Sequence, residues 1–97
     1  MSVEVHPTAL VAKGAELAEG VRIGPFCIVG ERARIGAGTT LKSHVVVDGA
    51  TEIGERNEIW PFAVLGGPPQ HTAYKGEDTR LVIGDDNLIR EHATMNL

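Results

Sequence analysis

The chain has 97 residues and a mass of 10.3 kDa, with 42% hydrophobic and 23% charged side chains, which suits one domain over residues 1–97. Nine basic against 13 acidic side chains give a net charge of −4, which disfavours nucleic acids and anionic membranes as partners because both require a basic surface. Apolar runs too short to span a bilayer, no export signal and a single cysteine, Cys27, predict a cytoplasmic protein without membrane insertion.

A period of six residues runs along almost the whole chain. Every sixth residue from Val5 onwards is a large aliphatic; the run is Val5, Val11, Leu17, Ile23, Val29, Ile35, Leu41, Val47, Ile53, Ile59 and Leu65. The frame fails at His71 and Glu77 and resumes at Ile83, Ile89 and Met95. Such self-similarity at a short fixed period is typical of solenoid proteins.

Two further positions of the repeat indicate its geometry. The residue after the aliphatic one is often glycine, and we expect the chain to turn there with a positive φ; these residues are Gly24, Gly30, Gly36, Gly54, Gly66 and Gly84, with Asp48 and Asn96 as variants. The residue four positions after the aliphatic one is mostly small and should face a narrow interior; examples are Ala9, Ala15, Cys27, Ala33, Thr39, Thr51, Ala63 and Ala93.

Short strands that turn a corner every six residues predict a triangular parallel β-solenoid of about 18 residues per coil. A helix competes in segments such as residues 9–19, which lack proline. A six-residue period, however, scatters the aliphatic side chains over every face of a helix. The predicted fold class is therefore all-β.

The break in the frame locates an insertion. The segment Ile53-Gly54-Glu55-Arg56-Asn57-Glu58-Ile59 recurs thirty residues later as Ile83-Gly84-Asp85-Asp86-Asn87-Leu88-Ile89, which equals one coil plus a 12-residue insertion. We therefore expect about four and a half coils and one loop excursion near residues 71–82. Asn57 should lie directly below Asn87, where their amides either form a hydrogen-bonded ladder or each satisfy their own turn.

Several segments are more specific than the six-residue repeat and indicate which kind of solenoid protein this is. In chain order they are His6-Pro7-Thr8-Ala9, residues 23–30 (IGPFCIVG), residues 41–47 (LKSHVVV), Pro69-Gln70, residues 74–77 (YKGE) and Ile89-Arg90-Glu91. Together they resemble the N-terminal coils of acyl-acyl carrier protein:UDP-N-acetylglucosamine O-acyltransferases, hexapeptide-repeat enzymes. The resemblance covers nearly the full chain and implies a left-handed parallel β-helix.

The resemblance also implies an activity. These enzymes are homotrimers with active sites between subunits, and they move a 3-hydroxyacyl chain from acyl carrier protein to the 3-hydroxyl of UDP-N-acetylglucosamine in lipid A biosynthesis. The implied partners are thus acyl carrier protein, UDP-N-acetylglucosamine and two further copies of the chain, with no cofactor. Acyl transfer to a hydroxyl needs a general base and donors that stabilise an oxyanion.

The resemblance implies that the general-base histidine lies beyond residue 97, so we expect no catalytic residue here and an inactive chain when it stands alone. His6 is expected to be structural in the opening turn, and His44 to point outward in a structural or interfacial role. His44, His71 and His92 are 27 and 21 residues apart, not multiples of the coil length, which disfavours a zinc site.

Three residues are the candidate substrate contacts by resemblance: Gln70, His71 and Asn96. Gln70 matches the family pattern and either contacts the ligand or is solvated. Family members usually carry an acidic residue at the position of His71, a lysine at Ala73 and a histidine at Asn96. Lys75 is a candidate to supply the charge that Ala73 lacks.

The repeat frame is still intact at Leu97, and a solenoid needs a terminal cap. We therefore interpret the chain as the N-terminal segment of a longer enzyme. The alternative, from a different class, is a short non-catalytic hexapeptide solenoid that acts as an assembly scaffold. Further Ile-Gly repeats after Leu97 in the reading frame would favour the enzyme, and a stop codon would favour the scaffold.

Overall fold

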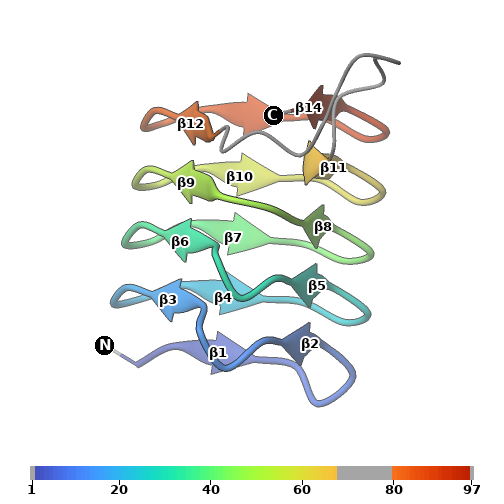
Figure 1. Cartoon of the computed structure of the whole chain (residues 1–97). Coiled ribbons are helices and arrows are strands. Elements are labelled where there is room, and N and C mark those ends of the chain that lie inside the picture. Colours follow the sequence, from blue (N-terminus) through green and yellow to red (C-terminus); the bar gives the residue numbers. More distant parts are fainter. Residues whose placement is uncertain (1, 68–79, 97) are drawn as a thin grey trace.

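Short strands joined by corners wind the chain into a stack of coils (Figure 1) in the computed structural model, which describes residues 2–67 and 80–96. The strands are β1 (Glu4–Val5), β2 (Leu10–Val11), β3 (Glu16–Leu17), β4 (Arg22–Ile23), β5 (Ile28–Val29), β6 (Arg34–Ile35), β7 (Thr40–Leu41), β8 (Val46–Val47), β9 (Thr51–Ile53), β10 (Glu58–Ile59), β11 (Val64–Gly67), β12 (Leu81–Ile83), β13 (Leu88–Ile89) and β14 (Thr94–Asn96). Four coils contain three strands each and a fifth contains two. The predicted all-β solenoid of about four and a half coils is confirmed, and the helix at residues 9–19 is excluded.

The strands form three parallel sheets, one on each side of a triangular prism. Sheet A has the order β1-β4-β7-β10-β13, sheet B β14-β11-β8-β5-β2 and sheet C β12-β9-β6-β3. Paired residues are 18 positions apart below the insertion, as in Ile23 with Leu41. Above it they are 30 apart, as in Ile59 with Ile89, which confirms the 12-residue insertion.

The predicted excursion near residues 71–82 lies mostly outside the described residues. Its predicted end is too late, because Leu81 and Val82 already belong to β12 and pair with Thr51 and Glu52 of β9. The side chain of Leu81 packs against the core there, so burial returns the chain to the sheet earlier than the frame at Ile83 suggested.

The aliphatic frame points into the prism, as predicted. Ile35, Leu41, Ile59 and Leu65 are at most 2% exposed. Val5, in the first coil, is 44% exposed because no coil covers it from below. The small residues four positions after the aliphatic ones are also buried through the middle coils; these are Val21, Cys27, Ala33, Thr39, Val45, Thr51, Asn57 and Ala63.

The prediction of a positive φ directly after the aliphatic residue is wrong at most positions. Of the glycines there, only Gly66 has a positive φ, of 79°, within the described residues. The left-handed residues mostly stand two positions further along; they are Gly20, Phe26, Gly38, His44, Arg56, Phe62, Asp86 and His92. Glycine is needed instead for close stacking of coils, because a Cβ added to Gly36 would lie 2.6 Å from the carbonyl carbon of Gly54.

Neither predicted arrangement of the stacked asparagines is the one observed. The Asn57 amide donates to the carbonyl of Gly84 (2.8 Å), and its oxygen accepts from the backbone N–H of Asn87 (2.8 Å). Asn57 is only 2% exposed, and its amide binds the backbone of the next coil rather than its own turn or the amide of Asn87.

Within the described residues there is no helix long and apolar enough to cross a membrane.

Candidate functional site at the root of the excursion

We call the segment between β11 of sheet B and β12 of sheet C the excursion; its described ends, Gly67 and Arg80, lie at the corner between these two sheets. Gly66 turns there with φ 79°, above the corner formed by Asp48 and Thr51. A Cβ on Gly66 would collide with the Thr51 hydroxyl oxygen and the Asp48 carbonyl. The Thr51 hydroxyl itself donates to that carbonyl at 2.7 Å, so glycine is required at this root.

One of the three candidate substrate contacts lies at this root. The backbone of Asn96 in β14 pairs with Gly67, after a shift in register that follows Leu65. Asn96 thus stands beside the last described residue before the excursion. Gln70 and His71 lie outside the described residues, as do Ala73 and Lys75.

At the other end of the excursion, Arg80 joins a column of alternating charges on the outer face of sheet C. Arg80 Nη1 lies 3.6 Å from Glu52 Oε1, which also pairs with Arg34 at 3.7 Å. Arg34 pairs in turn with Glu16 at 3.2 Å. These are exposed ion pairs, each contributing about 1 kcal/mol or less, and they link the returning chain to the coils below it.

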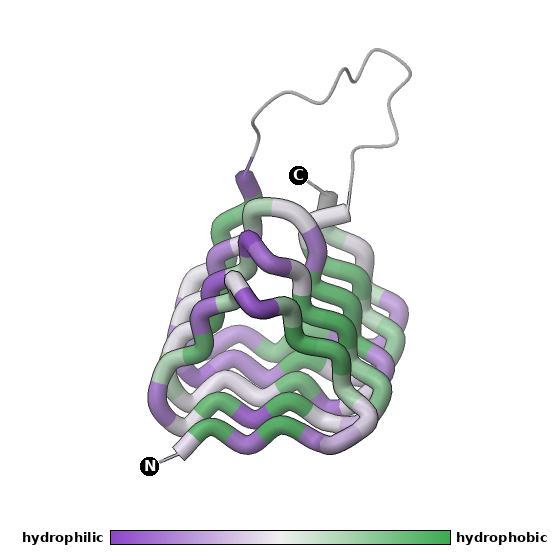
Figure 2. Tube along the Cα trace, turned by 60° about the horizontal axis from the view of Figure 1, so that its bottom comes forward, coloured by the Kyte–Doolittle hydropathy of each residue, from purple (hydrophilic) through white to green (hydrophobic). Residues whose placement is uncertain are grey.

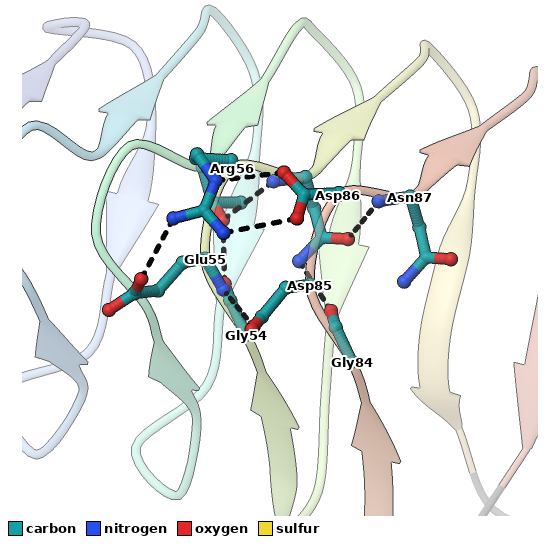
Figure 3. A network of polar contacts seen from close by, with 9 residues as sticks. Gly54, Glu55, Arg56, Gly84, Asp85, Asp86 and Asn87 are labelled. Carbon is teal, nitrogen blue, oxygen red and sulfur yellow. Dashed lines mark hydrogen bonds and ion pairs between the residues drawn. The ribbon is translucent and has the colours of Figure 1, made fainter.

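At the corner between sheets C and A, Glu55, Arg56, Asp85 and Asp86 join the coil that follows the excursion to the coil before it (Figure 3). We call this set of contacts the C–A lock. Arg56 donates to both carboxylate oxygens of Asp86, from Nε at 2.8 Å and from Nη2 at 3.0 Å. The backbone N–H of Glu55 donates to Asp85 Oδ1 at 2.7 Å. Together with Asn57, these residues fix the upper coil despite the 12-residue insertion beneath it.

The charges in this lock stabilise one another. The hydrogen bond from Arg56 lowers the pKa of the Asp86 carboxyl below its ordinary value, and the same contact raises the pKa of Arg56. Both side chains are solvent-exposed, so salt screens their attraction.

The corner between sheets A and B carries the described histidines. The His44 ring lies between Phe26 and Phe62, with ring centroids 5.1 and 5.0 Å away. It is tilted by 31° to Phe26 and stacked on Phe62, and His92 stacks on Phe62 at 5.4 Å. We call these four rings the aromatic column; their residues belong to the loops that join sheet A to sheet B, which are the right-hand loops in Figure 1. His44 points outward as predicted, and its contacts here are with the rings above and below.

His6 belongs to the same corner in the first coil. Its Nδ1 accepts the backbone N–H of Thr8 at 3.2 Å, and the Thr8 hydroxyl oxygen accepts the backbone N–H of Phe26 at 3.0 Å. This is the structural role predicted for His6. His6, His44 and His92 therefore all lie at the A–B corner, whereas the excursion leaves from the B–C corner.

The described residues do not assemble a metal or nucleophile site. In the part of the chain that the structure covers, no three His, Cys, Asp or Glu side chains lie together in a way that could hold a metal ion. Cys27 is buried in the core, and burial raises the pKa of its thiol despite opposing hydrogen bonds from the backbone of Val45 and Gly24. A protonated, buried thiol is a poor nucleophile.

The chain is similar to known hexapeptide-repeat proteins in both sequence and structure. The family model for the bacterial transferase hexapeptide (six repeats) matches residues 14–49. The chain is a left-handed parallel β-helix built from hexapeptide repeats. In sequence it is similar to UDP-N-acetylglucosamine O-acyltransferases, and it spans about a third of their length.

Three relatives show the extent of this similarity. The acyl-[acyl-carrier-protein]–UDP-N-acetylglucosamine O-acyltransferase of Azorhizobium caulinodans is 53% identical over 92 residues, which cover 95% of this chain and 34% of the relative. The structure of LpxA from Acinetobacter baumannii is 52% identical with a TM-score of 0.93, over 95% of this chain and 36% of that one. The UDP-N-acetylglucosamine O-acyltransferase (LpxA) of Moraxella catarrhalis is 48% identical with a TM-score of 0.91, over the same shares.

Sequence reasoning missed the outward-facing columns. A signal for them exists at the coil period: Phe26, His44, Phe62 and His92 are separated by 18, 18 and 30 residues. The charge column on sheet C has the matching pattern Glu16, Arg34, Glu52. Reading the chain only at a period of six obscures these columns, because it mixes residues from three different sides of the prism.

Proposed function

We propose that this chain forms the N-terminal coils of a cytoplasmic acyltransferase that moves a 3-hydroxyacyl chain from acyl carrier protein to the 3-hydroxyl of UDP-N-acetylglucosamine, a step of lipid A biosynthesis. The observation that carries the proposal is the 53% identity, over 92 residues, with an enzyme named for acyl carrier protein and this sugar nucleotide. The TM-score of 0.93 with a solved relative supports it.

In this proposal the excursion and its root supply contacts to the sugar nucleotide. Gln70 and His71 follow Gly67 by three and four residues in the sequence, and Asn96 pairs with Gly67. Amide and imidazole groups suit the hydroxyls and amide of an amino sugar, because they both donate and accept hydrogen bonds.

The general base belongs to the rest of the enzyme. The described histidines lie at the A–B corner, where the rings of His44 and His92 pack against Phe62 in the aromatic column. We therefore expect the 97-residue chain alone to be inactive. The experiment measures acyl transfer to UDP-N-acetylglucosamine by this chain and by a longer chain that continues past Leu97. Turnover by the 97 residues at the rate of the longer chain would contradict this division of roles.

The outer face of sheet B supports assembly into a homotrimer. Leu10 and Ile28 are 67% and 47% exposed there, and Val46 and Val64 continue the column in register. Sheet C carries the charge column instead. Figure 2 shows hydrophobic (green) and hydrophilic (purple) residues stacked in separate columns along the prism. A continuous apolar column on a surface is a contact site for another molecule, here a second copy.

The assembly is tested by mass. Light scattering at tens of micromolar should give a trimer for the chain. Ile28→Glu, on sheet B, should reduce that mass, whereas Val82→Glu, at an even more exposed position on sheet C (62% against 47%), should leave it unchanged. A monomer before any substitution, or equal effects of the two variants, would contradict assembly through sheet B.

The alternative is a non-catalytic scaffold, which a reading frame that stops at Leu97 would favour. In that case the chain should bind its own copies but not UDP-N-acetylglucosamine. Hexapeptide repeats that continue past Leu97 would leave the acyltransferase as the function.

A further inference from the structure

A second column on the A–B corner surrounds the single tryptophan. Lys42, Trp60 and Arg90 each follow the last residue of a sheet A strand, β7, β10 and β13, whose ends pair in register. Lys42 Nζ lies 4.9 Å and Arg90 Cζ 4.8 Å from the indole centroid. Because they belong to the coils below and above, the two cations lie on opposite faces of the ring, where its quadrupole attracts them.

The indole N–H of Trp60 has no partner. In the described part of the chain, Nε1 of Trp60 is the one buried side-chain nitrogen or oxygen without a hydrogen bond. Buried indole N–H groups usually find an acceptor, and an unsatisfied one calls for a specific explanation such as a bound ion. This donor lies between two positive charges, which favour a negatively charged acceptor.

Each cation has a carboxylate neighbour that reaches it but does not bond to the indole. Lys42 Nζ lies 3.5 Å from Glu58 Oε1, and Arg90 Nε lies 2.9 Å from Glu91 Oε1. The side chains of Lys42 and Arg90 are 40% and 63% exposed. They can therefore turn from these carboxylates toward a ligand without any movement of the backbone.

We propose that Lys42, Trp60 and Arg90 form a binding site for a phosphate group. Nε1 of Trp60 is closed to solvent in this structure, so the site opens only when Lys42 and Arg90 turn away from the indole ring. The indole N–H then donates to one phosphate oxygen, and Arg90 and Lys42 provide charge-assisted hydrogen bonds to the others, in competition with Glu91 and Glu58. A guanidinium matches two oxygens of a tetrahedral oxyanion, and an ammonium supplies a mobile charge. The site is separate from the root of the excursion, which leaves from another corner of the prism.

The single tryptophan makes a direct test possible, because the ¹⁵N-labelled chain has one indole N–H resonance. Titration with inorganic phosphate should shift that resonance and saturate in the millimolar range, whereas sodium chloride at matched ionic strength should not. A titration with a phosphate monoester distinguishes free phosphate from the phosphate of a larger ligand as the species bound. A shift that never saturates, or that chloride reproduces, would mean an adventitious ion only and overturn the proposal.

Variants give a second criterion that does not depend on the wild-type affinity. Arg90→Gln should weaken phosphate binding about tenfold, since it removes one charge-assisted contact. Glu58→Gln should strengthen binding several-fold because it removes a competitor for Lys42. Arg34→Gln, on sheet C, is the control and should change nothing. Equal affinities of the Glu58→Gln variant and the wild-type chain would contradict competition at this site.

Discussion

Thr39 and Asn57 tie successive coils together in the same way. The Thr39 hydroxyl donates to the carbonyl of Gly54 (2.7 Å) and accepts the backbone N–H of Asn57 (3.2 Å). Asn57 makes the equivalent pair of contacts to Gly84 and Asn87 one coil higher. Polar groups thus replace aliphatic ones at two buried positions without leaving an unsatisfied partner, which is the condition for burying them at low cost.

Asn57→Ala should destabilise the chain by about 1–3 kcal/mol, because it removes both contacts and leaves backbone groups of the next coil without partners. Asn87→Ala is a matched control, since Asn87 is exposed and should change stability by about 0.5 kcal/mol or less. Thermal or urea unfolding of the two variants provides the comparison. An equal loss in both would indicate that Asn57 is not a link between coils.

Gly66 and Gly84 occupy the same position of the repeat but differ in their surroundings. Gly66→Ala should cost roughly 2 kcal/mol or more, because the methyl group meets Thr51 and Asp48 at a φ of 79° that strains an L-residue. A Cβ at Gly84 meets nothing within 4 Å, so Gly84→Ala should be almost neutral. Unfolding midpoints of the two variants measure the difference, and a stable Gly66→Ala chain would refute the close approach at the root.

At the scale of elements, the three corners have different chemistry although they come from one repeat. The A–B corner carries aromatic rings, the C–A corner carries the Arg56–Asp86 pair, and the B–C corner releases the excursion. The C–A lock matters because the excursion interrupts the chain only between sheets B and C. The coil above can therefore keep its register through contacts on the uninterrupted side.

The C–A lock predicts a pH dependence. Asp86 has a lowered pKa in the folded chain, so its contribution is present above the ordinary aspartate pKa and is lost as the pH falls through the lower folded value. A carboxyl ¹³C titration should place Asp86 below an ordinary aspartate, and Arg56→Gln should raise it. Arg80→Gln, on sheet C, should leave it unchanged. An unaltered Asp86 titration in Arg56→Gln would refute the pairing.

The elements were largely predictable, and the sites only in part. An aliphatic residue at every sixth position predicts the strands and coils, because each of these positions must be buried. The failure of this pattern at His71 and Glu77 predicts the insertion. The roles of Asn57 and the glycines were not predictable in the same way. They depend on what the next coil places opposite, which lies 18 or 30 residues away, and on carbonyl groups that every residue possesses.

At the scale of the whole molecule, stability rests on the inward frame. Ile35→Asp should cost roughly 3 kcal/mol or more, since it places a charge among apolar side chains. Arg34→Asp, the neighbouring outward position, loses only exposed ion pairs and should cost about 1 kcal/mol. Labelling of the buried Cys27 thiol reports the difference: it should be fast in Ile35→Asp and slow in Arg34→Asp. Equal labelling rates would contradict the frame.

The candidate substrate contacts come from resemblance, and the structure relates only Asn96 to the root of the excursion. Gln70 and His71 carry no periodic signal because they lie where the repeat stops. Fold and homology nevertheless agree over the same residues: 95% of the chain matches solved and curated relatives at about half identity. At that level the coils of two proteins should be interchangeable.

Exchange of coils tests the central claim most directly. This chain, substituted for the matching 92 residues of the Azorhizobium caulinodans acyltransferase, should give a folded chimera that transfers acyl chains to UDP-N-acetylglucosamine within about tenfold of the parent enzyme. The same chimera with Ile35→Asp should be inactive because the coils do not form. A folded chimera of native mass without acyl transfer would contradict the proposal that these 97 residues are the N-terminal coils of such an enzyme.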